Sequence, residues 1–85
     1  MTPLFNAVII VDDEKNTREG LGRFLEEKNY DVFQADGGKQ ALDMIREHRP
    51  DLALIDLKMP EMDGLTLLHR IKSLNPATIV IMLTA

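Results

Sequence analysis

Three nearly uninterrupted apolar runs most constrain the fold of this chain. They are Ala7–Val11, Leu52–Asp56 and Thr78–Thr84, and β-branched residues are frequent in the first and the last. None of them alternates apolar with polar residues, as a strand with one solvent-exposed face would. Continuous apolar runs of this length are typical of strands that helices cover on both faces, as in parallel sheets. The runs therefore predict parallel strands rather than hairpins.

A segment with helical spacing follows the first strand. The spacing predicts a helix over Thr17–Lys28, capped by Asn16 or Thr17 and with Leu21, Phe24 and Leu25 on its inward face. Asn29 tolerates the left-handed conformation that often ends a helix. Tyr30–Ala35 is then predicted to form a short strand, the second of four in chain order.

Two further helices are predicted between the remaining strands. The first follows the turn at Gly37–Gly38, faces inward through Ala41, Leu42 and Ile45, and is closed by Pro50. The second carries Leu65, Leu68 and Ile71 and is broken at Asn75–Pro76. Strands and helices thus alternate strictly with short connections, which predicts an α/β, doubly wound parallel sheet with helices on both faces.

Polar side chains stand where three of the predicted strands end. Asp12 and Asp13 follow the first strand, Asp56 ends the third, and Thr84 ends the last. Functional groups of open α/β sheets gather at the carboxyl ends of the strands. Carboxylates crowded there repel one another unless a cation neutralises them, so the cluster predicts a divalent metal ion, and metal-assisted phosphoryl chemistry at an aspartate. Taken singly, each aspartate is equally well explained as a turn or capping residue.

Composition narrows the function classes. With 85 residues the chain forms one domain at most, and its formal net charge of -4 argues against direct nucleic-acid binding. The absence of cysteine removes disulfides and thiolate chemistry and fits a reducing compartment. No apolar run approaches membrane-spanning length and no signal peptide is visible, so we expect a cytoplasmic protein without membrane contact.

On these residues the chain resembles a response-regulator receiver domain of bacterial two-component signalling. The resemblance rests on Val11–Glu14, on Asp56, on the loop Lys58–Gly64 and on Thr84–Ala85, and it extends from about residue 7 to residue 85. It implies a flavodoxin-like sheet with strand order 2-1-3-4, and a signalling module rather than an enzyme.

The resemblance also implies roles for single residues. Asp56 would accept a phosphoryl group from a histidine kinase or phosphotransfer protein, or from acetyl phosphate. Mg²⁺ would be bound by Asp13, Asp56 and the backbone carbonyl of Lys58, with Asp12 acting mostly through water. Thr84 would be the hydroxyl that responds to phosphorylation.

A full receiver continues through a further helix, strand and helix, and its last strand ends in a lysine that contacts the phosphoryl group. Residues 1–85 are therefore expected to be a receiver fragment with impaired output, whose uncharged last strand recruits a second copy of the chain. Two alternatives stay open: an inert assembly or folding fragment, and a small Mg²⁺-dependent aspartyl phosphohydrolase. The kinase, the output domain and the origin of the truncation are not determined by the residues.

Overall fold

The computed structural model describes residues 6–83, so Thr84 lies outside the described residues. Four parallel strands form one sheet in the order β2-β1-β3-β4, which confirms the predicted doubly wound topology. The strands are β1 (Ala7–Val11), β2 (Asp31–Ala35), β3 (Leu52–Asp56) and β4 (Ile79–Leu83). The connecting helices are α1 (Lys15–Glu27), α2 (Gly38–His48) and α3 (Gly64–Leu74). Among residues 6–83, no helix has both the length and the apolar character needed to cross a bilayer.

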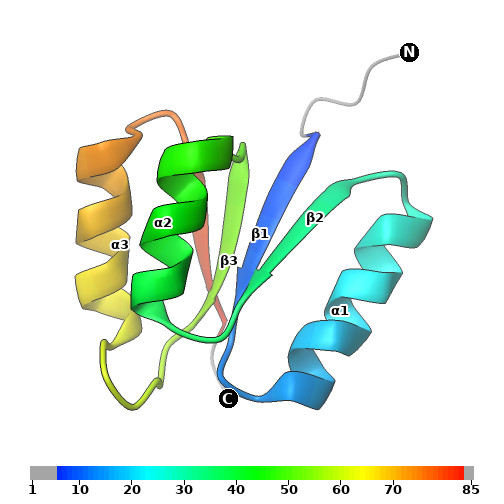
Figure 1. Cartoon of the computed structure of the whole chain (residues 1–85), viewed down its shortest axis with the longest axis horizontal. Helices are drawn as coiled ribbons and strands as arrows, with labels where there is room; N and C mark the ends of the chain where they lie inside the picture. Colours follow the sequence, from blue (N-terminus) through cyan, green and yellow to red (C-terminus); the bar gives the residue numbers. More distant parts are fainter. Residues whose placement is uncertain (1–5, 84–85) are drawn as a thin grey trace.

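Helices cover the two faces of the sheet unequally. Figure 1 shows α2 and α3 side by side on one face and α1 on the other. Ile9 and Val11 belong to the buried cluster that α2 and α3 complete. Val8 and Ile10 point to the opposite face, because side chains alternate along a strand, and they are also fully buried or nearly so. The central strand is thus apolar throughout because both of its faces are covered.

The start of α1 differs from the prediction by two residues. The helix begins at Lys15, and Glu14 caps it: its carboxylate accepts the backbone N–H groups of Asn16 at 3.0 Å and Thr17 at 3.2 Å. The hydroxyl of Thr17 donates to the same carboxylate at 2.6 Å. Short polar residues are the favoured caps, so the sequence pattern pointed to Asn16 or Thr17 and was wrong. At the other end Asn29 is left-handed with φ 71°, as predicted.

Phe24 was predicted to face the core, and this was wrong. Its side chain is 54% exposed, and the ammonium of Lys28 lies 5.4 Å from the centre of its ring. The buried residue of α1 is Gly22, where an added Cβ would meet the side-chain nitrogen of Gln34 at 2.7 Å. The helix therefore approaches β2 closely through a glycine, a contact that hydrophobic periodicity does not register.

Two smaller differences concern the face covered by α2 and α3. Leu65 is 56% exposed, because α3 buries Gly64, Leu67 and Ile71 instead. The ring of His48, near the end of the same face, stacks on Phe33 with centroids 4.2 Å apart, a contact that the sequence pattern does not indicate. Which residues of α3 are buried depends on the side that the helix turns toward the sheet, and apolar spacing alone does not fix that side.

Candidate metal and phosphoryl site

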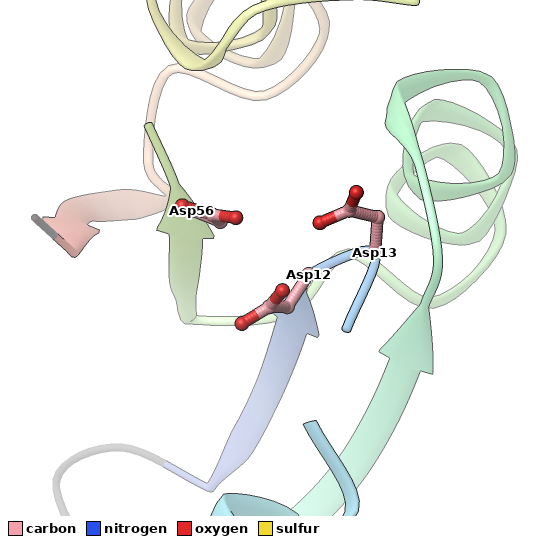
Figure 2. Close-up of side chains that lie close together, drawn as sticks. All are labelled: Asp12, Asp13 and Asp56. Carbon is pink, nitrogen blue, oxygen red and sulfur yellow. The ribbon is translucent and has the colours of Figure 1, made fainter. Parts of the chain in front are cut away.

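The strand register brings two of the predicted aspartates to the same level of the sheet. Val11 of β1 pairs with Ile55 of β3, so the next residues, Asp12 and Asp56, lie beside each other. Asp13 follows at once, and Figure 2 shows the three carboxylates converging at this edge. One oxygen from each of the three lies within 4.8 Å of the others. The order of neighbouring strands reverses between β1 and β3, and the crevice at such a switch point is where open α/β sheets bind ligands.

Three hydrogen bonds, two to its backbone and one to its side chain, fix the position of Asp12. Its N–H donates to the carbonyl of Ala35 at 3.1 Å, and its Oδ1 accepts the N–H of Glu14 at 2.9 Å. The guanidinium of Arg18 donates to its carbonyl oxygen at 2.8 Å. The position of Arg18 at the site was missed by sequence reasoning, because a residue six positions along the chain reaches back only if the chain bends.

Asp56 and Lys58 form a short turn at the end of β3. The N–H of Lys58 donates to Asp56 Oδ1 at 3.2 Å, while Lys58 itself is exposed. Asp63 closes the loop by capping α3 through the N–H of Thr66 at 2.8 Å, and this bond holds the pKa of the Asp63 carboxyl below its usual range. The roles predicted for the Lys58 carbonyl and for Thr84 stay predictions.

Burial raises the pKa of Asp12. Its side chain is only 7% exposed, so desolvation of the charged form is the largest cause, and the charges of Asp56, Asp13 and Glu14 add to it. The hydrogen bond from the Glu14 N–H opposes the rise without cancelling it. A charged Asp12 therefore costs stability in the absence of a cation, which is the behaviour expected of a site arranged for binding rather than for folding.

Asp12→Asn should reveal this cost as a dependence on pH. Since the pKa is raised on folding, the folded protein holds the Asp12 proton more tightly, and stability is lost as pH rises through the interval between the ordinary and the raised value. We expect the variant to be more stable than the wild type at about pH 7, and the gap to close below about pH 4. Urea unfolding in EDTA measures the free energy of unfolding of both proteins at each pH. A difference between them that stays constant with pH would contradict the prediction.

The donor set suits a hard divalent cation. Carboxylate oxygens are the ligands that Mg²⁺ prefers, and it keeps several waters in addition. Asp12 and Asp56 each engage Oδ1 with a backbone N–H, which leaves their second oxygens without a hydrogen bond among residues 6–83. A cation would also relieve the mutual repulsion that helps to raise the pKa of Asp12.

Comparisons with known proteins show the family and the fold to which this chain is similar. The family model of the response regulator receiver domain matches residues 8–85. Sporulation initiation phosphotransferase F of Bacillus subtilis is 42% identical over 78 residues, which cover 92% of this chain and 63% of that protein. The response regulator receiver domain protein (CheY-like) of Methanospirillum hungatei JF-1 aligns with a TM-score of 0.90 at 32% identity, over 94% of this chain and 64% of that one.

A solved complex offers a second structural comparison. This chain aligns with the CheX-CheY-BeF3-Mg+2 complex from Borrelia burgdorferi with a TM-score of 0.87 at 30% identity, covering 94% of this chain and 62% of that one. The chain therefore spans less than two thirds of each of these three proteins.

Proposed function

The chain belongs to the response regulator receiver domain family, and from this membership we propose that Asp56 accepts a phosphoryl group in a Mg²⁺-dependent reaction. The observation that carries the proposal is the convergence of three carboxylates within 4.8 Å at the switch point of the sheet. Asp56 suits the acceptor role better than Asp12, because it is half-buried and reachable, whereas Asp12 is only 7% exposed.

The residues proposed to hold Mg²⁺ are Asp12, Asp13, Asp56 and the backbone carbonyl of Lys58. Asp13 and Asp56 would contact the ion directly and Asp12 mostly through water. Bound there, the ion would supply charge neutralisation between an anionic nucleophile and an anionic phosphoryl group. The complex of the Borrelia protein with beryllofluoride and magnesium supports this assignment by analogy.

The backbone prepares Asp56 for attack. The Lys58 N–H donates to Oδ1 and holds the carboxylate in place, so that one of its oxygens would ligate the ion while the other would attack phosphorus in line with the donor. The bond from phosphorus to the donor's imidazole nitrogen, or to the acyl oxygen of acetyl phosphate, breaks. Its electron pair stays on that nitrogen or oxygen, which leaves. An acyl phosphate on Asp56 results, with roughly two negative charges and three acceptor oxygens, and the hydroxyl of Thr84 is proposed to respond to it.

The phosphodonor proposed is a histidine kinase or a phosphotransfer protein, and the module signals rather than turning over a substrate. A cytoplasmic location belongs to the same proposal, in keeping with the absence of cysteine. Incubation with Mg²⁺ and acetyl phosphate should add the mass of one phosphoryl group, and EDTA should prevent it. Turnover of phosphate esters would instead favour a phosphohydrolase, and neither reaction nor Mg²⁺ binding would favour an inert fragment.

Self-association through β4 is a further part of the proposal. Ile79 and Ile81 are 45% and 46% exposed on the strand at the edge of the described sheet, and uncharged β-branched edges pair readily with other strands. We expect light scattering at micromolar concentration to show a dimer, and Ile79→Lys with Ile81→Lys to return it to a monomer. A stable, cooperatively unfolding monomer of the wild type would contradict the expectation.

A further inference from the structure

Arg18 links the start of a helix to the end of a strand at the acidic cluster. It lies in the first turn of α1, and its Nη1 donates a hydrogen bond of 2.8 Å to the backbone carbonyl of Asp12. The contact is partly buried and joins residues six positions apart. It therefore spans the bend that contains Asp13.

The bend at Asp13 allows two adjacent aspartates to reach Asp56. Successive side chains of an extended strand point to opposite faces, so Asp12 and Asp13 could not both reach Asp56 if β1 simply continued. Instead the strand ends at Val11 and the chain bends at Asp13, which brings an oxygen of each aspartate into the same 4.8 Å cluster. Beyond the end of the ladder the carbonyl of Asp12 needs another donor, since a buried carbonyl without one is costly. Arg18 is that donor.

We propose that Arg18 is a positioning residue, which holds the peptide between Asp12 and Asp13 so that both carboxylates serve one cation. In this role Arg18 would touch neither the cation nor the phosphoryl group and would act through the Asp12 carbonyl, to which it donates. The inference rests on the proposed function in one respect, namely that the cluster is the Mg²⁺ site. Arg18 lies outside the three aspartates and, on this inference, determines whether they are brought together.

The direction in which Mg²⁺ affinity changes when Arg18 is removed distinguishes a positioning role from a purely electrostatic one. Arg18 is a positive charge close to the acidic cluster; hydrogen bonds from Thr17 and Asn16 are the main reason that the pKa of Glu14 lies below its usual range, and the charge of Arg18 adds a smaller part. If its charge were all that mattered, removing it would strengthen Mg²⁺ binding, because a repelling cation is gone. If Arg18 positions the bend, removing it weakens binding, by roughly 10- to 100-fold as for other groups that orient metal ligands.

Calorimetric titration with Mg²⁺ provides the test. Arg18→Ala is expected to bind more weakly than the wild type, and Arg18→Lys, which keeps the charge and a donor, to recover most of the loss. Arg23→Ala is the matched control, because Arg23 is exposed on the same helix and forms no ion pair within residues 6–83. Unchanged or tighter binding by Arg18→Ala would overturn the proposal. If that variant does not fold, Arg18→Met keeps the apolar stem and takes its place.

Two further readouts distinguish positioning from a general loss of structure. The amide of Glu14, which donates to Asp12 Oδ1 at 2.9 Å, should exchange faster in Arg18→Ala while amides of β3 do not. With acetyl phosphate, the half-saturating Mg²⁺ concentration should rise while the rate at saturating Mg²⁺ stays unchanged. A lowered saturating rate with an unchanged Mg²⁺ requirement would overturn the proposal.

These readouts also separate the inference from the proposed function. If the wild type binds Mg²⁺ and is not phosphorylated, the phosphoacceptor assignment fails, and the order of Mg²⁺ affinities among the variants still decides on Arg18. If the wild type binds no Mg²⁺, the metal site fails and this inference fails with it, whatever the amide of Glu14 shows.

Discussion

Asp56→Asn is expected to abolish the mass gain from acetyl phosphate, lowering the rate by more than about 1000-fold as the loss of a nucleophile does. The amide oxygen of asparagine carries no negative charge and is a poor nucleophile toward phosphorus. It can still accept the hydrogen bond that the Lys58 N–H makes to Asp56 Oδ1, so the end of β3 should keep its conformation. Replacing one of three mutually repelling carboxylates should also leave the fold at least as stable.

Intact mass spectrometry after incubation with Mg²⁺ and acetyl phosphate measures this outcome. Asp43→Asn is the matched control, because the Asp43 side chain is 68% exposed on α2 and, within residues 6–83, its one ion pair is a 3.4 Å contact with Arg46. The control should gain a phosphoryl group as the wild type does. A persisting mass gain in Asp56→Asn would move the acceptor to another aspartate, and peptide mapping would then show whether Asp13 carries it.

Gly64→Ala is expected to destabilise the fold by about 1–3 kcal/mol, the usual cost of forcing an extra carbon into a filled site. A Cβ at Gly64 would lie 2.9 Å from the carbonyl oxygen of Asp56 and 3.0 Å from the Cα of Leu57, and would also meet Met82 Cε. The methionine can move aside, but the two backbone atoms belong to the last residue of β3 and to the residue after it. The substitution should therefore displace Asp56 and weaken Mg²⁺ binding as well.

Gly20→Ala is the control, and its expected effect has the opposite sign. A Cβ at Gly20 meets nothing within 4 Å, and alanine is favoured over glycine inside a helix by up to about 1 kcal/mol. Urea unfolding in EDTA, followed by Mg²⁺ titration, compares the two variants with the wild type. A Gly64→Ala protein with wild-type stability would show that the end of β3 gives way more easily than its close contacts imply.

Sequence patterns predicted the elements well and the helix faces less well. The bounds of β1 and β3 match the apolar runs, because strands covered on both faces must be apolar throughout. Phe24 was misplaced because an amphipathic pattern gives the helix a favoured side but does not set its rotation, which the close approach at Gly22 determines. The cap of α1 was misplaced because Glu14 takes up a role usually filled by shorter residues.

Some residues of the candidate site could likewise be predicted from the sequence and others could not. Alternation of strands and helices places Asp12, Asp13 and Asp56 at the carboxyl edge of a sheet, because parallel strands all end at the same side. Residues whose roles depend on a close approach were not recognisable: Gly64 reads as loop punctuation, and Arg18 as one more surface charge.

The amino-acid order by itself determined that this chain folds as a parallel α/β unit with acidic residues at one edge, since local apolar periodicity and chain connectivity suffice for that. The resemblance already implied that β1 and β3 are neighbours. Only the tertiary structure decided the register that sets Asp12 beside Asp56, and the bend at Asp13 that the hydrogen bond from Arg18 spans. The reason is physical: register, helix rotation and the bend are set by contacts between residues far apart in the sequence, whose energies no local pattern contains.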